Sequence, residues 1–479
     1  MFPSQRNFKP PLLTGRAYPT LGLAMIMKNE AHNLPYSLGP LAGLMDEIVV
    51  VDTGSTDSSQ EMAAAYGATV LHFPWQDDFS KARNYGLERM KSDFILWLDA
   101  DNSLTMADLS IIRDKLGEGA LVLTATEVVV PQGDKLWQKR VFANSPKARF
   151  QGRVHEQLAH PADWPVAHTQ AEIRHWGYAN GEMARQKGHR NLQLLVSDPL
   201  TSSGDFYYLY QTGRTLINLR YFKEAKAYLN RAIEAGLLAE GLPGQGQGLA
   251  WPGGQALPGE DSLEFVSLPR EAKPGLPYRV GASIPDYSSL SPESIEVALE
   301  EAIEESFVQA NAEIAGFNPS LWCHALILLS QAQQRLCERD ESEETLRYLC
   351  RAMPNYGPGR AALGRALYEA GDYAGCAPQL MKALALGCGD PGWGADHRKQ
   401  GFVAACQLAK ASEGLGCLEE ARKAWEEAVR LNPEHPEPYV ALAESSLTEG
   451  DTSKAKSLLE EAIRLSPSHR RAKALERSL

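Results

Sequence analysis

The sequence predicts an α/β domain followed by an all-helical repeat domain. Short apolar runs rich in β-forming residues alternate with helical segments over residues 21–195. Beyond residue 203, small residues recur at fixed spacings that are typical of paired helices. Within that second region, a stretch dense in glycine and proline predicts an insertion, because such sequence cannot maintain a helix.

Composition limits the classes of function open to this chain. Its 479 residues are 44% hydrophobic, which is enough for two or three domains with their own cores. The formal net charge is −12 without a long basic run, so we expect no nucleic-acid partner. No apolar run approaches the ~20 residues that cross a bilayer. The first twenty residues also lack the apolar core of a signal peptide. We therefore expect a soluble, cytoplasmic protein.

All seven cysteines lie in the C-terminal third of the chain, and none forms a CxxC motif. We interpret them as small buried apolar residues of a protein in a reducing compartment. They are Cys323, Cys337, Cys350, Cys376, Cys388, Cys406 and Cys417.

The apolar runs of the first region predict the strands of a parallel sheet. They cover Leu21–Met27, Glu47–Asp52, Ala68–Phe73, Phe94–Asp101 and Gly119–Val130. Helical segments lie between some of them, at Ser55–Gly67 and Phe79–Ser92. Near-continuous apolar strands that alternate with helices are typical of a parallel sheet covered on both faces. Residues 1–20 would precede this domain as an N-terminal extension.

Acidic residues stand at the ends of two predicted strands, where ligands bind in parallel α/β sheets. Asp99 and Asp101 end the fourth strand, two residues apart. Both carboxylates can reach one Mg²⁺ or Mn²⁺ ion, whose remaining positions diphosphate oxygens would fill. A solvated turn is the alternative interpretation of this pair.

Asp52 ends the second strand and is followed by the small polar residues Thr-Gly-Ser-Thr. A carboxylate there can accept hydrogen bonds from a base or ribose, and a loop of small residues lets backbone N–H groups approach a nucleotide. An ordinary helix start, with Ser55 or Asp57 as the N-cap, explains the same residues equally well.

Small residues repeat with spacings of 12 and 7 in the second region. The copies are Gly213–Ala225–Ala232, Gly364–Cys376–Ala383, Ala409–Ala421–Ala428 and Ala443–Ala455–Ala462, and a further copy near Ala332 fits less well. The last two copies are offset by 34 residues, and a proline follows each. Small residues let paired helices approach closely, and the proline ends the second helix. The pattern resembles tetratricopeptide repeats, with generic amphipathic helices as the alternative.

The repeats divide the second region into three parts. Residues 196–238 would form a first helical repeat, and residues 291–479 the tetratricopeptide-repeat domain. Residues 239–290 would form the Gly- and Pro-rich insertion between them. Two alternatives stay open for that insertion: a flexible segment, or a loop ordered against the first domain.

Six motifs of the first region occur in an order that resembles the family-2 glycosyltransferases of GT-A fold. They are KNEAHNL, VVDTGSTD, WQDDFSKARN, LWLDADN, RFQGRVHEQL and HWGYANGEMARQKGHRNLQLL. The resemblance covers roughly residues 20–195, and relatives often carry tetratricopeptide repeats as well. One departure is Asn102, where relatives usually have an acid. The resemblance implies an enzyme that transfers a sugar from a nucleotide-sugar donor.

The resemblance also implies donor-binding roles. Asp52 would hold the nucleoside, helped by Asn29, Glu30 and Asp78. Arg83 would contact the donor. Asp101, with Asp99 beside it, would carry a Mn²⁺ or Mg²⁺ ion and the diphosphate, and His175 would supply a further metal ligand, which a neutral imidazole can do. A histidine satisfied within the core is the alternative for His175.

On the acceptor side, the resemblance implies that Glu156 is the catalytic base and that Gly152 lies in the acceptor loop. Glu156 as a surface acid at a helix start is the alternative. His155 is either a functional partner or structural. Lys187 and Arg190 fall near the expected diphosphate, with solvated helix residues as the alternative.

The mechanism implied is inverting transfer, in which the acceptor oxygen attacks the anomeric carbon while the nucleoside diphosphate leaves. A nucleotidyltransferase is disfavoured because no glycine cluster follows the first strand. An inactive repeat scaffold is disfavoured by the intact Asp99/Asp101 pair, Glu156 and His175. We expect the repeats to recruit a protein or peptide acceptor. A glycan, a lipid-linked glycan and a small molecule are the alternatives.

Overall fold

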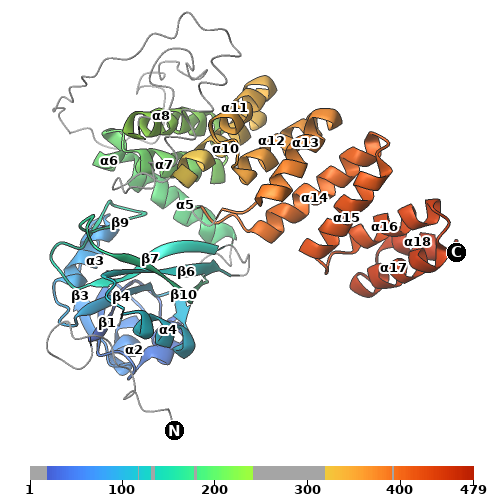
Figure 1. The fold of residues 1–479 in the computed structure, drawn as a ribbon. Coiled ribbons are helices and arrows are strands. Elements are labelled where there is room, and N and C mark those ends of the chain that lie inside the picture. Colours follow the sequence, from blue (N-terminus) through green and yellow to red (C-terminus); the bar gives the residue numbers. More distant parts are fainter. Residues whose placement is uncertain (1–18, 117, 131–134, 177–180, 241–318, 391–392) are drawn as a thin grey trace, which may run out of the picture. The chain divides into compact units, whose positions relative to one another are not determined.

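The computed structural model describes residues 19–116, 118–130, 135–176, 181–240, 319–390 and 393–479. The expected N-terminal extension and the insertion at residues 239–290 fall almost entirely outside these ranges. The chain divides into two compact units, residues 1–202 with 355–479, and residues 203–354. The α/β domain, the helices of the second unit and the C-terminal helices are described in turn (Figure 1).

An eight-stranded sheet forms the centre of the α/β domain, in the order β3-β2-β1-β4-β7-β6-β10-β5. The strands are β1 (Leu21–Met27), β2 (Glu47–Asp52), β3 (Thr69–His72), β4 (Phe94–Asp99), β5 (Asn102–Leu104), β6 (Val122–Val129), β7 (Lys135–Ala143) and β10 (Val166–His175). A separate ribbon pairs β8 (Arg149–Gln151) with β9 (Gln157–Ala159).

The prediction of a parallel sheet is right for one half of it. Strands β1 to β4 pair in parallel, with β1 between β2 and β4. In the other half the prediction is wrong for β7, which runs antiparallel to both β4 and β6, and for β5, which runs antiparallel to β10, whereas β6 and β10 pair in parallel. Only a short connection joins β6 to β7, and such a connection allows an antiparallel hairpin rather than a crossover. Lys135, Gln138, Lys139 and Arg140 interrupt the apolar residues of β7, so it shows no continuous apolar run.

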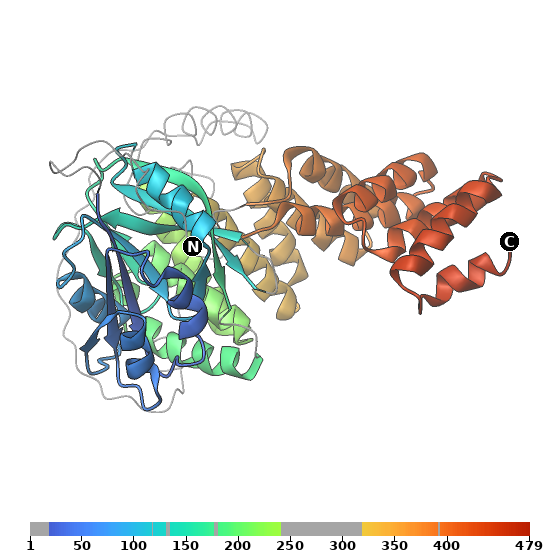
Figure 2. The same cartoon turned by 90° about the horizontal axis from the view of Figure 1, so that it is seen from below.

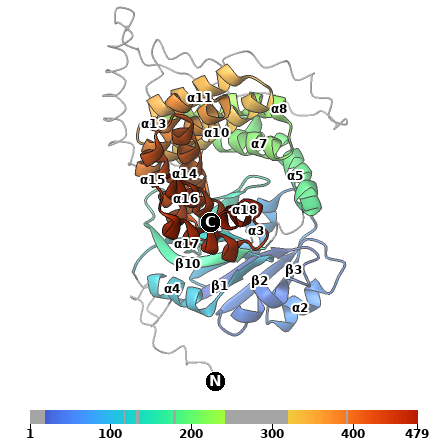
Figure 3. The same ribbon diagram turned by 90° about the vertical axis from the view of Figure 1, so that its right-hand side faces the viewer.

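Helices cover the two faces of this sheet. On one face lie α1 (Leu34–Ser37), the short helix η2 (Gly39–Leu41), α2 (Ser59–Ala65) and α4 (Met106–Leu116), which share a core cluster with Leu96 and Leu98 of β4. On the other face, α3 (Phe79–Leu87) and the β8–β9 ribbon share a cluster with Ile95 and Trp97. Figure 3 shows α2 and α4 on one side of the sheet and α3 on the other. The alternation of side chains along β4 produces both clusters.

The second unit consists of paired helices. These are α7 (Phe206–Asn218), α8 (Phe222–Glu240), α10 (Pro319–Arg335) and α11 (Arg339–Ala352). Gly213 lies against Leu229, and a Cβ at Gly213 would come within 2.6 Å of the Leu229 Cγ atom. The small residue therefore sets how closely α7 and α8 approach.

The C-terminal helices continue the pattern of pairs, drawn in orange and red in Figure 2. They are α12 (Gly357–Ala370), α13 (Tyr373–Leu386), α14 (His397–Gly414), α15 (Leu418–Leu431), α16 (Pro436–Thr448), α17 (Thr452–Leu465) and α18 (Arg470–Glu476). Ala409, Ala428, Ala443 and Ala462, four of the predicted small residues, are fully buried. The prediction of helical repeats is confirmed. No helix among the described residues has the length and apolar character that crossing a membrane requires.

The interpretation of the cysteines is only partly right. Cys323, Cys350, Cys376 and Cys388 are buried, and Cys406 is half-buried. Cys337 and Cys417 are exposed, because each lies in a turn between two helices. All seven are free thiols, and burial raises the pKa of Cys376, Cys388 and Cys406 to about 11.

His324 of α10 is a buried titratable group in the second unit. Its Nδ1 atom lies 2.8 Å from the Tyr210 hydroxyl oxygen on α7. Burial, together with the nearby positive charge of Arg214, lowers the pKa of His324 well below its usual value. The folded chain therefore keeps this imidazole neutral at a pH where an exposed histidine takes up a proton.

We predict that His324 makes the chain less stable in mild acid. Below the ordinary value of 6.5 the unfolded chain binds a proton at His324 and the folded chain does not, so the free energy of unfolding falls by at most about 1.4 kcal/mol per pH unit. Urea denaturation at pH 7.5, 6.0 and 5.0 should show a weaker decline for His324→Asn than for the unsubstituted chain. The exposed control His435→Asn should keep the original decline; an equal flattening in both variants would contradict the prediction.

Candidate active site

The loops after β1 and β2 interlock at the carboxyl end of the sheet. Asn29 has a left-handed backbone (φ 58°), and its N–H donates to the Ser55 Oγ atom at 2.9 Å. In return, the N–H of Thr56 donates to the Asn29 Oδ1 atom at 2.7 Å. Asn29, a residue predicted to help bind the nucleotide-sugar donor, therefore holds the loop that follows Asp52.

Asp52 is completely buried at the end of β2. Its carboxylate accepts hydrogen bonds from the N–H groups of Gly54 and Ser55 and from the Gln60 side chain. The charge is thus stabilised by donors of its own loop. The N-cap of helix α2 is Ser58, so the alternative with Ser55 or Asp57 as the N-cap is wrong, although Asp57 does accept the N–H of Ser59 at the start of the helix.

Glu30 and Asp78 also make local contacts. The Glu30 Oε2 atom accepts the Asn33 amide at 2.7 Å. Burial raises the pKa of Glu30; the Asn33 bond opposes that effect, and the negative charge of Asp101 adds to it. Asp78 is the N-cap of α3 and accepts the Lys81 N–H and the Ser80 hydroxyl. Glu30 therefore lies close to Asp101, while Asp78 fixes the start of the helix that carries Arg83.

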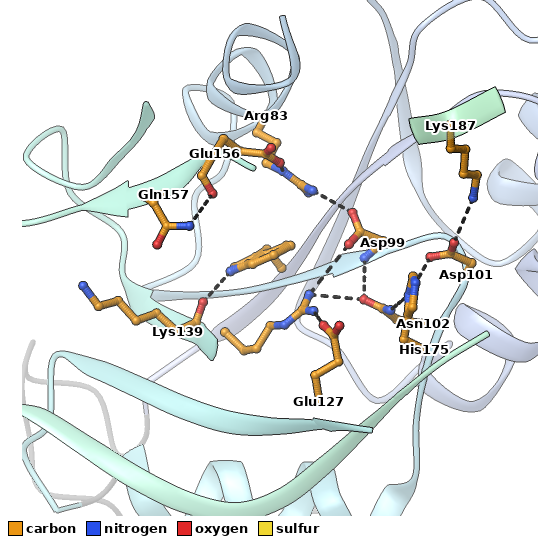
Figure 4. A network of polar contacts seen from close by, with 12 residues as sticks. Arg83, Asp99, Asp101, Asn102, Glu127, Lys139, Glu156, Gln157, His175 and Lys187 are labelled. Carbon is orange, nitrogen blue, oxygen red and sulfur yellow. Dashed lines mark hydrogen bonds and ion pairs between the residues drawn. The ribbon is translucent and has the colours of Figure 1, made fainter. Parts of the chain in front are cut away.

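Arg83 joins two of the predicted acidic residues. Its Nε atom lies 2.5 Å from the Glu156 Oε1 atom, and its Nη2 atom lies 2.6 Å from the Asp99 Oδ1 atom. Figure 4 shows the guanidinium between the two carboxylates. Burial alone lowers the pKa of Arg83, but Asp99 and Glu156 together raise it above its ordinary value. Asp99 and Glu156 lie 16 and 73 positions from Arg83 in the sequence. The three side chains form one buried charge cluster.

The ring of Trp97 packs against the guanidinium groups of this cluster. The Arg83 guanidinium carbon lies 4.4 Å from the centre of the Trp97 ring, and that of Arg140 lies 3.9 Å from it. The indole N–H donates to the Lys139 carbonyl oxygen at 2.7 Å, which fixes the ring plane. Stacking of a guanidinium on an aromatic face is favourable, and it fixes the plane in which the guanidinium N–H groups point.

Arg140 and Glu127 belong to the site but were not predicted from the sequence. Arg140 is only 1% exposed, and its guanidinium contacts the Glu127 carboxylate and the Asn102 Oδ1 atom. It lies 4.0 Å from the Asp99 Oδ2 atom. The signal for Arg140 in the sequence was its position directly before the apolar residues that end β7. A bulge in the pairing of β6 with β7 places Arg140 in the interior, and sequence alternation does not reveal a bulge.

The two aspartates that end β4 face different partners. Burial raises the pKa of Asp99, but the charges of Arg83 and Arg140 outweigh that effect and lower it overall. Asp101 instead lies 3.3 Å from the His175 Nδ1 atom and 3.8 Å from the Lys187 amine. Figure 4 shows these two groups beside Asp101, away from Arg83.

His175 lies at the end of β10 and contacts the loop after β4. Its Nδ1 atom is 3.0 Å from the Asn102 Nδ2 atom, and β10 pairs with β5 at these two residues. Burial lowers the pKa of His175, whereas Asp101, Glu127 and Asp99 raise it, and the net change is upward. Asn102, the departure from the family pattern, therefore connects His175 to Arg140 and to the N–H of Asp99.

The residues around Asp101 fit a divalent cation only in part. Asp101 and His175 offer an oxygen and a nitrogen 3.3 Å apart, close enough to share one ion. Among the described residues, no group of three histidine, cysteine or acidic side chains could hold a metal. Asp99 is turned toward the arginines, so further ligands would have to come from substrate and water.

Glu156 is presented by the turn between β8 and β9. Gly152 and His155 both have positive φ values, 93° and 53°, so this turn depends on left-handed residues before the glutamate. The Arg153 N–H donates to Asp198 at 2.7 Å, and the Arg153 carbonyl oxygen accepts the Phe79 N–H at 2.8 Å. The alternative of an acid at a helix start is wrong, because Glu156 precedes a strand and its side chain is 9% exposed.

Helix α5 (Gly181–Val196) carries the basic residues predicted near the diphosphate. Lys187 lies beside Asp101, so it belongs to the site. The guanidinium of Arg190 lies 5.2 Å from the centre of the Phe79 ring and donates to the Asn191 side chain. Of the two, Lys187 is the residue placed next to a predicted metal ligand.

Comparison with known proteins assigns both parts of the chain to families. Residues 23–169 match the model of glycosyl transferase family 2, and residues 206–235 and 415–479 match tetratricopeptide repeats. The chain therefore carries a family-2 glycosyltransferase domain followed by tetratricopeptide repeats, which confirms both resemblances drawn from the sequence.

Two relatives each match a little under half of the chain. A TPR repeat-containing protein of Synechococcus elongatus is 32% identical over 240 residues, covering 47% of this chain and 59% of the relative. The SPbeta prophage-derived glycosyltransferase SunS of Bacillus subtilis is 27% identical over 232 residues, covering 45% and 53%. The chain thus spans little more than half the length of these relatives.

Two solved structures match parts of this chain with low TM-scores. The TPR protein YrrB, described as having an unusual peptide-binding site, has a TM-score of 0.33 at 12% identity and covers 57% of this chain and 93% of its own. Glucosyl-3-phosphoglycerate synthase of Mycobacterium tuberculosis, solved with Mn²⁺ and UDP, has a TM-score of 0.21 at 24% identity and covers 23% and 44%.

We predict that Arg83 is required for the stability of the site. Arg83→Met would leave the carboxylates of Asp99 and Glu156 without their shared partner, and should lower the free energy of unfolding by about 3–5 kcal/mol. Arg83→Lys keeps the charge but not the two-pronged geometry, so its loss should be smaller. Urea denaturation at pH 7 measures both.

The control for this prediction is Arg89→Met, an exposed arginine two residues beyond the end of α3. It should change the free energy of unfolding by no more than about 0.5 kcal/mol. Equal losses in the Arg83 and Arg89 variants would contradict the assignment of the buried cluster.

Proposed function

We propose that this chain transfers a sugar from a nucleotide-sugar donor to an acceptor hydroxyl, with inversion at the anomeric carbon. One observation carries the proposal: two clusters meet at the end of β4, one around Asp101 and His175 and one around Arg83 and Glu156. The first offers ligands for a cation that binds diphosphate. The second offers a carboxylate for the acceptor, and both lie where ligands bind in such sheets.

The loops after β1 and β2 would bind the nucleoside. Asn29 and Glu30 lie on the first of them, and the second is held in place by Asp52. Because the Asp52 carboxylate already accepts two loop N–H groups and Gln60, we assign it the role of shaping the pocket. Asp78 would act in the same indirect way, since it caps the helix that carries Arg83.

Charge favours a divalent cation at this site. A nucleoside diphosphate is strongly anionic, yet Glu30 and Asp101 already bring two carboxylates to the position proposed for it. Asp101 and His175 would hold Mn²⁺ or Mg²⁺. Bound there, the ion would neutralise negative charge that builds up on the leaving diphosphate. Lys187, beside Asp101, would face the same phosphate oxygens.

Glu156 would act as the general base. Arg83 binds its Oε1 atom, which fixes the carboxylate and leaves the Oε2 atom to face the acceptor. As the acceptor oxygen forms its bond to the anomeric carbon, the bond from that carbon to the diphosphate oxygen breaks, and the acceptor proton passes to Glu156. Asp99 completes the arrangement, because it holds the other end of the Arg83 guanidinium.

The repeats would recruit the acceptor. Stacked helix pairs form extended surfaces suited to a peptide segment, and joining such a surface to a catalytic domain raises the local acceptor concentration. We therefore propose a protein or peptide acceptor, with a glycan or lipid-linked glycan as the alternative. The seven free cysteines agree with a place in the reducing cytoplasm.

A pair of charge-removing variants tests the chemistry. Asp101→Asn should abolish Mn²⁺-dependent hydrolysis of the donor, found by screening nucleotide sugars, with turnover falling by at least about a thousandfold. Glu156→Gln should bind the same nucleoside diphosphate with nearly unchanged affinity in calorimetry and yet lose transfer to the acceptor. Full turnover in a folded Asp101→Asn variant would refute the cation site. Loss of nucleotide binding in Glu156→Gln would reassign that residue to the donor.

The role of the repeats is tested by removing residues 433–479. Helices α16, α17 and α18 have their own apolar cluster, and repeat proteins tolerate the loss of a terminal unit because contacts run between neighbours. Donor hydrolysis should persist while transfer to the native acceptor falls. Circular dichroism checks that the remaining helices stay folded. Undiminished transfer by the shortened chain would contradict acceptor recruitment by these repeats.

A further inference from the structure

An exposed aromatic pair lies on the same sheet face as the proposed base. Trp137 of β7 is 52% exposed, and its ring centre lies 5.0 Å from that of His168 on β10. Strand β6 runs between them, and Thr126 faces Trp137 in its register. Most large apolar side chains of this domain are buried, so a tryptophan that lies open on a central strand needs a reason.

The pair is held in a fixed orientation. The His168 Nδ1 atom lies 2.6 Å from the Thr124 hydroxyl oxygen, which anchors the imidazole to β6. Stacking at an angle of 36° then anchors the indole. At one end of this surface, Lys135 and Glu172 pair at 2.7 Å and neutralise each other. The result is a fixed, exposed aromatic surface with threonine hydroxyl groups of β6 beside it.

The sheet register connects this surface to the active site. Lys139 pairs with Thr124 and, like Trp137, points to the face that carries Trp97 and Phe150. Lys139 lies two residues from Trp137, about 7 Å along the strand. Its carbonyl oxygen accepts the Trp97 indole N–H, and Trp97 supports the Arg83 that binds Glu156. Figure 4 shows Lys139 and Gln157 on the side of Glu156.

We propose that Trp137 and His168 form a binding platform for a sugar ring of the acceptor. This inference rests on the proposed function and narrows its acceptor to a molecule that already carries a sugar. One face of a pyranose presents C–H groups with partial positive charge, which match the negative face of an indole. The hydroxyls at the ring edge suit Lys139 and Thr126 as hydrogen-bond partners. A free glycan and a glycosylated peptide present the same chemistry.

The test measures binding of neutral disaccharides to the full chain by saturation-transfer NMR and titration. The panel contains cellobiose, maltose, lactose and chitobiose. For any disaccharide that binds, Trp137→Ala should weaken the affinity roughly five- to tenfold, as expected for one lost stacking contact. Trp137→Phe keeps a ring and should retain most of the affinity, and His168→Ala should lie between the two.

A matched control is Val166→Ala, which removes an exposed apolar side chain from the same strand as His168. It should leave both disaccharide affinity and the rate of donor hydrolysis unchanged. The proposal is overturned if no disaccharide binds, if Trp137→Ala binds as well as the unsubstituted chain, or if only a sugar-free peptide depends on Trp137.

The outcomes separate this inference from the proposed function. Disaccharide binding that depends on Trp137, in a chain that turns over no nucleotide sugar, would support the platform and refute sugar transfer. Donor turnover, together with disaccharide binding that does not depend on Trp137, would support sugar transfer and refute the platform. Comparing the best disaccharide free and attached to a short peptide then distinguishes a glycan from a glycosylated protein as the source of the sugar.

Discussion

The site depends on one buried guanidinium. Arg83 binds Asp99 and Glu156 at once, and Trp97 supports it from below. Two carboxylates in a largely buried position repel each other and lose hydration, so neither would stay there charged without a shared cation. The two-pronged geometry also fixes where each carboxylate points. Because Glu156 comes from the β8–β9 turn, Asp99 from β4 and Arg83 from α3, this single side chain connects three separate parts of the domain.

The same interaction gives Asp99 and Asp101 different partners. Asp99 ends β4 and Asp101 lies in the turn that follows, so the alternation of a strand, which would place both side chains on one side, does not extend to Asp101. Arg83 and Arg140 hold Asp99, while His175 and Lys187 stand beside Asp101. The ion-binding part of the proposed mechanism then rests on Asp101 and His175, and the acceptor part on Asp99, Arg83 and Glu156. Asn102 links the two parts, since its side chain contacts His175 and Arg140.

The half of the sheet that contains β7 contributes further residues to the candidate site. Strands β6, β7 and β10 lie beyond β4, and the bulge at Arg140 turns that residue inward while Trp137 and Lys139 stay on the outer face. One strand thereby contributes both a buried charge under the catalytic cluster and an exposed ring beside it. The helical repeats obey a simpler constraint, in which small residues such as Gly213 and Gly364 allow each helix pair to close. The packing of the sheet domain and the packing of the helical repeats thus depend on different constraints.

The sequence by itself determined the fold classes, the strands β1 to β4 and β6, and the helical repeats, and it indicated most of the residues that gather in the candidate site. Those features depend on local periodicity and on motifs that stay together along the chain. It did not reveal the antiparallel strands, because Lys135, Lys139 and Arg140 leave β7 without a continuous apolar run, and the strand is stabilised by its neighbours rather than by its own composition. It also missed Arg140, Glu127 and the pairing of Arg83 with both Asp99 and Glu156. Contacts between residues 73 positions apart, such as Arg83 with Glu156 and Asn102 with His175, arise only when the sheet brings their elements together. Which carboxylate lies beside His175 and Lys187 and which lies between the arginines was therefore decided by tertiary structure alone.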